Sequence, residues 1–257
     1  MSENINPYEL STVTTYRKEI WNRFVKGINT YKLIEPNDKI AVCISGGKDS
    51  MLMAVLMKRL QRYSKFPFEV EYLVMDPGYN AINRRKIEDN AKLLDIPIRI
   101  FETQIFDAVA AVDNNPCYLC ARMRRGHLYK TAKELGCNKI SLGHHFNDVT
   151  ETILMGMLWG SQVQTMMPKI HSENYEGMQL NCTMCDNGGG GSKREEIKKL
   201  IKQLKKTNPE VDKHIFRSVE NVNLQTIISY HRGDEYHHFL DDFDEGRSVR
   251  GTKHDIL

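Results

Sequence analysis

Short apolar runs alternate with longer amphipathic segments through the first two thirds of the chain. Four runs have the length and polar flanks of buried parallel strands: 39–44, 69–75, 98–102 and 139–142. Between and after them, apolar residues recur at helical spacing, which predicts helices over 49–60, 82–94, 117–135 and 148–158. A leading helix is expected over 8–30, where Ile20, Phe24 and Ile28 share one face.

Alternation of strands and helices predicts an α/β fold with a doubly wound, mostly parallel, Rossmann-like sheet, because parallel strands need helical crossovers. Ligands of such folds bind beyond the carboxyl ends of the strands. Ser45, Asp76 and Gly143 follow three of the predicted strands. The sequence therefore predicts a ligand site around these three residues.

The alternation stops after about residue 165. A glycine-rich linker at 187–192 precedes a basic amphipathic helix in which Ile197, Leu200, Ile201 and Leu204 are expected to face inward. From residue 231 the chain is polar and mixed in charge, so a loosely ordered tail is expected. The predicted organisation is an N-terminal helical segment, an α/β domain, an extension with a helix and cysteines, and a tail: 1–35, 36–178, 179–230 and 231–257.

Composition places the chain among ordinary water-soluble proteins. Of its 257 residues 40% are hydrophobic and 27% charged. No stretch approaches the roughly 18 apolar residues of a membrane span, and the first residues lack the pattern of a signal peptide. We therefore expect a cytoplasmic protein without a membrane partner. The net charge of +3 is too small to indicate a nucleic-acid partner by itself.

The sequence Ser45-Gly46-Gly47-Lys48-Asp49-Ser50 stands between the first predicted strand and the following helix. Glycines let the backbone approach phosphate oxygens, and the start of a helix presents free N–H groups and a positive dipole end. Serine hydroxyls and the lysine add donors. The spacing differs from that of a Walker A loop. These residues predict a phosphate-binding loop, and a plain glycine-rich turn is the alternative.

This hexapeptide resembles the signature of the PP-loop ATP pyrophosphatase family. The resemblance implies that the chain binds ATP and Mg²⁺, cleaves ATP between the α- and β-phosphates and adenylates a carbonyl-type oxygen. It assigns Ser45, Gly46, Gly47, Lys48 and Ser50 to the pyrophosphate. It makes Asp49 a candidate organiser of metal and nucleotide.

Two further segments are similar to parts of the same family. Asp76 matches an acidic position that holds the nucleotide or its metal. The segment from Gly143 and His144 to Asp148, followed by Glu151-Thr152, resembles the motif G-H-x-x-D-D-x-x-E-T. Asn147 stands where the family often has an acidic residue. The resemblance implies that Gly143 and His144 contact the nucleotide and that Asp148 is a second organiser.

Four of the six cysteines form two CxxC pairs, Cys117/Cys120 and Cys182/Cys185. In a reducing compartment such pairs indicate metal or redox chemistry rather than structural disulfides. Thiolates suit both iron–sulfur clusters and zinc, so a four-thiolate zinc site remains an alternative. The isolated Cys43 and Cys137 are expected to fill the core.

The sequence around the first pair, CYLCARMRRG from residue 117, resembles the tRNA 2-thiocytidine synthetases. This resemblance extends over 16–170. It implies a [4Fe–4S] cluster held by Cys117, Cys120 and either Cys182 or Cys185. It also implies adenylation of the 2-carbonyl of a cytidine in a tRNA anticodon loop, followed by replacement of that oxygen by sulfur. The segment between Pro168 and Cys182 is shorter than in family members.

Two basic clusters would then face RNA. The first is Arg122, Arg124 and Arg125, next to the first cysteine pair; the second runs from Lys193 to Lys206 and includes Lys198 and Lys202. Such clusters are often only solvated helix faces. With tRNA as substrate, we expect both to contact the phosphate backbone.

Two other functions remain open. A PP-loop enzyme could use another nucleophile, as in lysidine or amide formation, but such enzymes do not need a CxxC pair beside Arg124-Arg125. Thiolation of a uridine in place of a cytidine stays open as well. A non-catalytic, zinc-stabilised RNA-binding module would not need the phosphate loop. For the thiolating enzyme, the resemblance also implies a sulfur donor such as a cysteine desulfurase, and a homodimer.

We predict that the protein, purified without oxygen, is brown and contains about four irons and matching acid-labile sulfide per chain. The measurements are iron and sulfide assays together with the visible spectrum. A colourless protein with stoichiometric zinc would exclude the cluster and leave an adenylating enzyme with another nucleophile.

Overall fold

The computed structural model describes residues 5–110, 116–171, 179–181 and 193–243. Within them, one six-stranded sheet has the order β3-β2-β1-β4-β6-β5. The strands are β1 (Lys39–Ile44), β2 (Glu69–Asp76), β3 (Ile98–Glu102), β4 (Lys139–Leu142), β5 (Ile170–His171) and β6 (Gln179–Asn181). All neighbouring pairs are parallel except β5–β6. The predicted α/β class with a mostly parallel sheet is confirmed.

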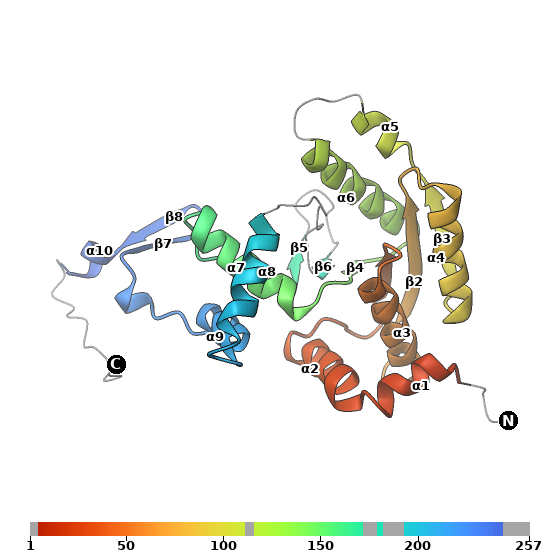
Figure 1. Cartoon of the computed structure of the whole chain (residues 1–257), viewed down its shortest axis with the longest axis horizontal. Helices are drawn as coiled ribbons and strands as arrows, with labels where there is room; N and C mark the ends of the chain where they lie inside the picture. Colours follow the sequence, from red (N-terminus) through yellow and green to blue (C-terminus); the bar gives the residue numbers. More distant parts are fainter. Residues whose placement is uncertain (1–4, 111–115, 172–178, 182–192, 244–257) are drawn as a thin grey trace.

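Helices cover both faces of this sheet (Figure 1). α3 (Lys48–Tyr63) and α4 (Ala81–Leu93) share one face, and α6 (Pro116–Glu134) covers the other. A short helix, α5 (Ile105–Ala110), follows β3 and was not predicted, because six residues carry too little periodicity to be recognised. The other predicted helices of this region agree with the structure to within a few residues.

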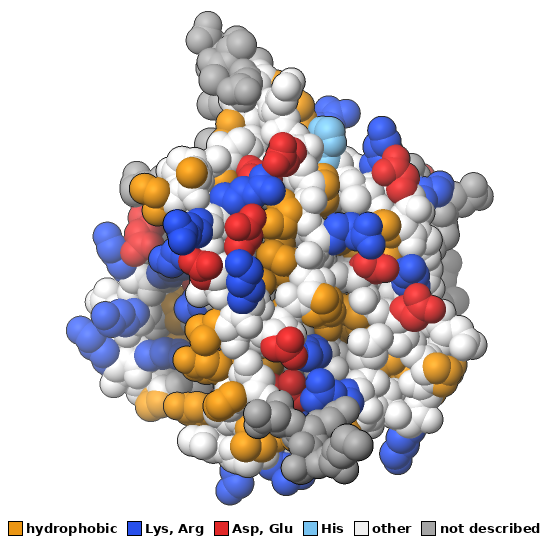
Figure 2. Space-filling view, turned by 90° about the vertical axis from the view of Figure 1, so that its right-hand side faces the viewer, with side chains coloured by type: hydrophobic (Ala, Val, Ile, Leu, Met, Phe, Trp, Pro, Cys, Tyr) orange, Lys and Arg blue, Asp and Glu red, His pale blue; other side chains and the backbone are white. Residues whose placement is uncertain are grey.

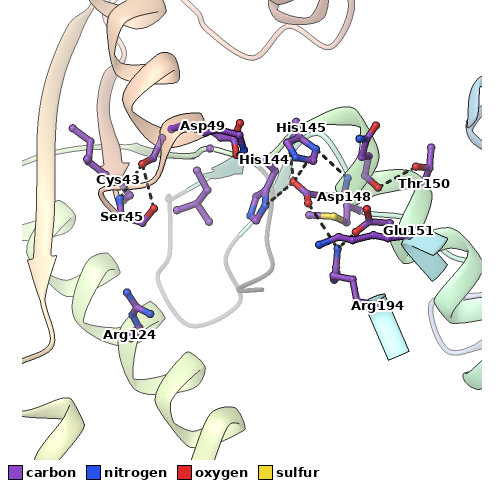
Figure 3. A pocket seen from close by; sticks show the side chains of 18 of the residues that line it. Cys43, Ser45, Asp49, Arg124, His144, His145, Asp148, Thr150, Glu151 and Arg194 are labelled. Atoms are coloured by element: carbon purple, nitrogen blue, oxygen red, sulfur yellow. Dashed lines mark hydrogen bonds and ion pairs between the residues drawn. The ribbon is translucent and has the colours of Figure 1, made fainter. Parts of the chain in front are cut away.

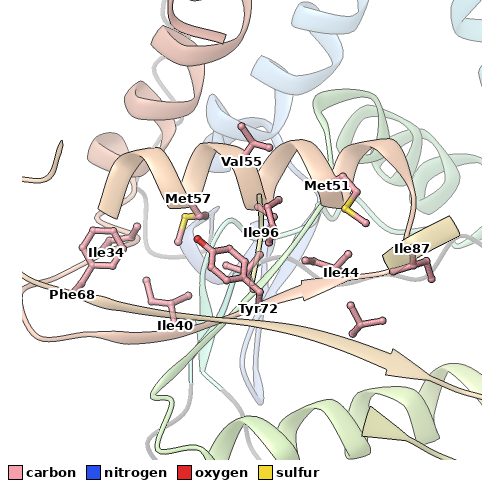
Figure 4. Packing of buried hydrophobic residues seen from close by; sticks show 13 residues of the cluster. Ile34, Ile40, Ile44, Met51, Val55, Met57, Phe68, Tyr72, Ile87 and Ile96 are labelled. Carbon is pink, nitrogen blue, oxygen red and sulfur yellow. The ribbon is translucent and has the colours of Figure 1, made fainter. Parts of the chain in front are cut away.

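The residues of β1 alternate between the two cores of the sheet. Ile40, Val42 and Ile44 pack under α3 with residues of β2 (Figure 4). Ala41 and Cys43 face α6 instead. Because both faces are covered, β1 is apolar at nearly every position. Cys43 belongs with Cys137 to the core under α6, which confirms the expectation for the two isolated cysteines.

The leading helix is broken, contrary to the expectation of one helix over 8–30. The chain forms α1 (Pro7–Val13), a π-helical turn η1 (Arg17–Trp21) and α2 (Asn22–Thr30). The break follows a β-branched run in which the Thr14 hydroxyl donates to the carbonyl of Leu10 at 2.9 Å. β-Branched side chains and local hydroxyl bonds both weaken a helix.

A second group of helices stands beside the sheet (Figure 1). α7 (Phe146–Trp159) packs against α8 (Lys193–Leu204) and α9 (Val211–Glu220). Ile197 and Ile201 of α8 are buried as predicted, whereas Leu200 and Leu204 are exposed, contrary to prediction. The buried stripe of α8 is rotated because Arg194, and not a leucine, completes it. No helix among the described residues has the length and apolar character needed to cross a membrane.

Part of the expected loose tail is ordered. After the turn η2 (Leu224–Thr226), strands β7 (Ser229–Arg232) and β8 (Glu235–His238) form a hairpin, followed by α10 (Phe239–Phe243). Gly233 has a φ of +64°, which a two-residue hairpin turn requires. Tyr230 stacks on His237 across the strands at 4.7 Å between ring centroids. Cross-strand aromatic contacts stabilise hairpins, and polar composition alone does not reveal them.

The face of the molecule on the right-hand side of Figure 1 mixes charges of both signs (Figure 2). Ion pairs account for part of this mixture: Lys58 with Asp95 at 2.5 Å, and Arg84 with Glu88 at 3.2 Å. Exposed pairs of this kind contribute little stability. This face does not present the single-signed surface that a polyanion would seek.

A buried ion pair joins the amino ends of β1 and β4. Lys139 is 2% exposed, and its ammonium contacts Asp38 at 2.7 Å and Glu35 at 2.9 Å. Asp38 is also buried and accepts a further bond from the Asn138 amide at 2.8 Å. This network fixes the amino-terminal ends of β1 and β4, which lie on the opposite side of the sheet from the carboxyl ends of the same strands.

Replacing Lys139 by methionine is expected to lower the free energy of unfolding by about 3–5 kcal/mol, because the Asp38 carboxylate stays buried without its counter-charge. Urea denaturation measures the change. Lys133→Met, at an exposed position of α6, is the control and should stay within about 0.5 kcal/mol of the unaltered protein. Equal stability of the two variants would contradict the role assigned to the buried pair.

Candidate nucleotide site

A cavity of about 650 Å³ lies at the carboxyl ends of β1 and β4. Four parts of the chain form its walls: the turn and first residues of α3 after β1, the turn after β4 with the start of α7, the middle of α6, and α8. Figure 3 shows these elements around one space. The site therefore combines the two turns identified in the sequence with α8, which comes from the C-terminal part of the chain.

The turn after β1 is held by the hydroxyl groups of its two serines. Ser45 Oγ and Ser50 Oγ are 3.2 Å apart, and the Ser50 hydroxyl donates to the carbonyl of Gly47 at 2.9 Å. The backbone N–H of Ser45 donates to Ser50 Oγ at 3.2 Å. Gly47 is the residue before α3, so the free N–H groups of the first turn of α3 lie at its N-terminal end, where Lys48, Asp49 and Ser50 line the cavity. This is the arrangement that favours an anion.

Two glycines permit close backbone contacts at this turn. Gly46 has a φ of +84°, and a Cβ there would lie 2.6 Å from Cγ1 of Ile87. At Gly143 a Cβ would lie 2.8 Å from the Cα of Ser50 and 2.9 Å from its nitrogen. The turn after β4 thus touches the backbone of the phosphate loop itself. Any larger residue at position 143 must push the two turns apart.

Two aspartates line the cavity at the two turns. Asp49 accepts from the Lys48 ammonium at 2.8 Å. Asp148 accepts from the backbone N–H of His145 at 2.9 Å, and His144 Nδ1 lies 3.7 Å from its carboxylate. Burial raises the pKa of Asp148, but the hydrogen bonds from His144 and His145 outweigh burial and lower it to about 2. Asp148 is therefore ionised at any ordinary pH.

A buried arginine from α8 joins the carboxylates of α7. Arg194 Nη1 lies 3.1 Å from Glu151 Oε2 and 3.8 Å from Asp148 Oδ1, while Nη2 is 3.4 Å from the hydroxyl of Thr152. Burial raises the pKa of Glu151, and Arg194 opposes that rise. The sequence pattern predicted no role for Glu151, and it placed Arg194 in a basic run expected to contact RNA. Glu151 stood in a recognised motif, but only the folded structure brings Arg194 to it.

The lining is also basic. It includes Arg124 and Arg125 of α6, Lys198 and Lys202 of α8, and Lys205 directly after α8. Four of these five were predicted to contact RNA, and the structure brings them to the same cavity as the phosphate loop. The fifth predicted residue, Arg122, is exposed on α6 outside the lining. Apolar side chains, among them Leu128 and Leu142, form another part of the lining.

Three predicted nucleotide contacts are not part of the cavity lining: Gly46 and Gly47 of the phosphate loop, and Asp76. The carboxylate of Asp76 is buried, accepts from the N–H groups of Gly78 at 2.9 Å and Tyr79 at 2.6 Å, and pairs with Arg84 at 3.1 Å. Burial opposes ionisation, yet these partners lower the pKa of Asp76. The residue does not belong to the lining of the cavity. It holds the turn after β2, and its nucleotide role stays a prediction.

The predicted cluster ligands are described only in part. Cys117 lies in the first turn of α6, and Cys120 is half-buried one turn before Arg124, which lines the cavity. Residues three or four apart share a helix face, so Cys120 lies on the side of α6 that faces the cavity. Cys182 and Cys185 fall outside the described residues. Among those that are described, no group of three or more His, Cys, Asp or Glu side chains could hold a metal ion.

The fold and this cavity define a class of α/β protein that binds a nucleotide by a glycine-rich turn after the first strand. The model of the PP-loop domain matches residues 17–206, about three quarters of the chain. The chain therefore belongs to the PP-loop family, as the hexapeptide at Ser45–Ser50 predicted.

Several curated relatives carry the same name. The tRNA-cytidine(32) 2-sulfurtransferase of Neisseria gonorrhoeae is 39% identical over 152 residues, which are 58% of this chain and 48% of that protein. The protein of the same name from Bdellovibrio bacteriovorus is 30% identical over 246 residues, 86% of this chain and 93% of that one. The chain matches about half of the length of the Neisseria relative.

The fold is also that of a solved structure, the U34-tRNA thiolase NcsA from Methanococcus maripaludis with its [4Fe-4S] cluster. The TM-score is 0.60 at 19% identity, over 78% of this chain and 77% of the other.

We predict that Gly143→Ala weakens the binding of ATP with Mg²⁺ about tenfold or more, a loss of about 1.4 kcal/mol. The added methyl group overlaps the backbone of Ser50 and must move the phosphate loop. Isothermal titration calorimetry measures the dissociation constant.

The matched control is Gly126→Ala in α6, where a Cβ meets nothing within 4 Å. Alanine favours a helix over glycine by about 1 kcal/mol, so this variant should be at least as stable and bind ATP normally. Unchanged ATP affinity in Gly143→Ala would show that the contact between the two turns does not shape the site.

Proposed function

We propose that the chain is an ATP-dependent tRNA sulfurtransferase that converts a cytidine of the anticodon loop to 2-thiocytidine, forming AMP and pyrophosphate. One observation carries the proposal: Ser45, Lys48 and Ser50 of the phosphate loop line the same cavity as the cationic side chains that come from α6 and α8. An ATP site needs the phosphate loop, and binding of an RNA backbone needs the cationic side chains. The relatives named tRNA-cytidine(32) 2-sulfurtransferase supply the substrate class.

In the first step, the cytidine 2-carbonyl oxygen attacks the α-phosphorus of ATP. A bond forms between that oxygen and phosphorus, and the bond to the β-phosphate bridging oxygen breaks. Ser45, Gly46, Gly47, Lys48 and Ser50 hold the departing pyrophosphate through N–H groups, hydroxyls and the ammonium. These donors stabilise charge as it develops, which is the main source of catalysis in such transfers.

Asp49 and Asp148 are the groups we propose to hold Mg²⁺ on the phosphates. Both line the cavity, one at each turn, and Asp148 is ionised because its pKa is about 2. Carboxylate oxygens are preferred ligands of Mg²⁺. His144 and the His145 N–H orient Asp148, and Gly143 lets this turn reach the phosphates.

In the second step, sulfur displaces AMP from carbon 2 of the adenylated cytidine, and AMP departs with the original carbonyl oxygen. Cys117, Cys120 and Cys182 or Cys185 are the residues proposed to hold a [4Fe–4S] cluster, which would present sulfide from an unligated iron when bound. Thiolates are suitable ligands for it. The proposal includes a sulfur donor such as a cysteine desulfurase and a homodimer, both from family resemblance.

The cationic wall is proposed to guide the RNA. Arg124 and Arg125 approach the cavity from α6, and Lys198 and Lys202 approach it from α8. A phosphate backbone between these helices would bring one base to the apolar lining near Leu128 and Leu142. Arg122, exposed one turn away, would extend the contact outside the cavity.

The test is a thiolation assay without oxygen on the complete protein, with ATP, Mg²⁺, sulfide and a tRNA transcript. We expect 2-thiocytidine in the digested RNA by mass spectrometry, with one AMP and one pyrophosphate per sulfur. Asp49→Asn should reduce the rate at least a hundredfold, because the metal loses a charged ligand. Asp89→Asn, on the exposed face of α4, is the control and should retain full activity.

Other outcomes would replace the proposal. Pyrophosphate release without sulfur in the RNA would indicate a PP-loop enzyme with another nucleophile. Release of neither product, from a zinc-containing protein that still binds RNA, would indicate the non-catalytic module.

A further inference from the structure

We infer that Arg194 is a positioning residue: it fixes the first turns of α7, and with them the Asp148 carboxylate, against α8. This inference rests on the proposed function for its catalytic consequence but not for its structural one. Arg194 belongs to a basic run that the sequence offers as an RNA-contacting surface, yet its side chain is buried and contacts acids.

The first observation is the geometry of the guanidinium. One nitrogen lies 3.1 Å from Glu151 and 3.8 Å from Asp148, and the other lies 3.4 Å from Thr152 Oγ1. Figure 3 shows Arg194 rising from α8 towards Asp148 and Glu151. A planar guanidinium with several fixed donors can hold three acceptors in one arrangement, which an ammonium cannot do.

The second observation is that these acceptors are themselves tied to the start of α7. Asp148 and His145 form a reciprocal cap, with the His145 N–H donating to the carboxylate and the Asp148 N–H donating to His145 Nδ1. The Thr152 hydroxyl donates to the carbonyl of Asp148 at 2.8 Å. Arg194 therefore contacts both ends of one short network that determines where Asp148 points.

The third observation is burial. Glu151 is 3% exposed and Arg194 7%, and both also line the cavity. A buried carboxylate without its counter-charge is costly, so Glu151 favours α8 docked on α7. Ile197, one turn further along α8, is fully buried and adds apolar packing to the same contact.

The consequence concerns the step that uses Asp148. If the carboxylate must point at the metal as charge develops, then loosening it lowers turnover more than it lowers the affinity for ATP. A purely structural pair would instead lower stability and leave the turnover of folded molecules unchanged. The two roles can therefore be separated by measurement.

The experiment compares Arg194→Lys and Arg194→Met with Arg217→Met, at an exposed arginine of α9 outside both basic clusters. Hydrogen–deuterium exchange is followed for residues 146–152 in the complete protein with ATP and Mg²⁺. Turnover is followed as pyrophosphate release with tRNA, corrected for the folded fraction. We expect at least tenfold faster exchange in Arg194→Met and an intermediate rate in Arg194→Lys. We expect kcat to fall about thirtyfold in Arg194→Met, with KM for ATP within threefold, and partial rescue in Arg194→Lys.

Each outcome of this experiment either supports or overturns the positioning role of Arg194. Exchange equal to that of Arg217→Met in both Arg194 variants overturns the inference, whether or not tRNA is thiolated. Faster exchange with an unchanged kcat would show that Arg194 has only a structural role, and this result would also overturn the inference. If Arg194→Met does not fold, Arg194→Lys keeps the charge and supplies both measurements. Absence of thiolation by the unaltered protein refutes the proposed function, while exchange still tests whether Arg194 fixes α7.

Discussion

The site depends on the parallel pairing of β1 with β4. Cys43 is paired with Leu142 in register, so the two chains leave the sheet side by side. Each then turns at once into a helix, and the turns touch where Gly143 meets the backbone of Ser50. Two polar segments that are about a hundred residues apart in sequence thus become one surface. Neither turn has the shape of a site without the other, because one supplies the donors and the other supplies Asp148.

Much of this arrangement could be predicted from the sequence. The strands are buried on both faces and so read as continuous apolar runs, and the glycines of the phosphate loop stand directly after one of them. The other features of the site depend on contacts that hydrophobic periodicity does not encode. In the sequence, Arg194 is one of several cations on a basic helix. Leu200 was predicted to lie in the core, because the apolar pattern does not show that a buried arginine shifts the buried face of α8. Asp76 matched a motif, but the N–H groups that bind its carboxylate come from the local turn.

Charges of both signs line the cavity. Asp49 and Asp148 lie at the two turns, and cations of α6 and α8 complete the lining. Arg194 pairs with Glu151 and approaches Asp148, so it links the two groups. Elsewhere, as on the face with α4, charges of both signs alternate and pair locally. The cavity differs from that face because cations from several elements converge on one space.

The position of α8 in the chain affects how the protein is made. The ribosome releases the phosphate loop and the turn after β4 first, and it releases Arg194 46 residues after Asp148. Domains fold as the chain emerges, so a nascent chain can build the sheet while Glu151 still lacks its counter-charge and the cavity lacks one wall. Such a chain has the phosphate loop but lacks the wall of the cavity that α8 supplies. Docking of α8 is therefore the step that both supplies this wall of the cavity and gives Glu151 its counter-charge.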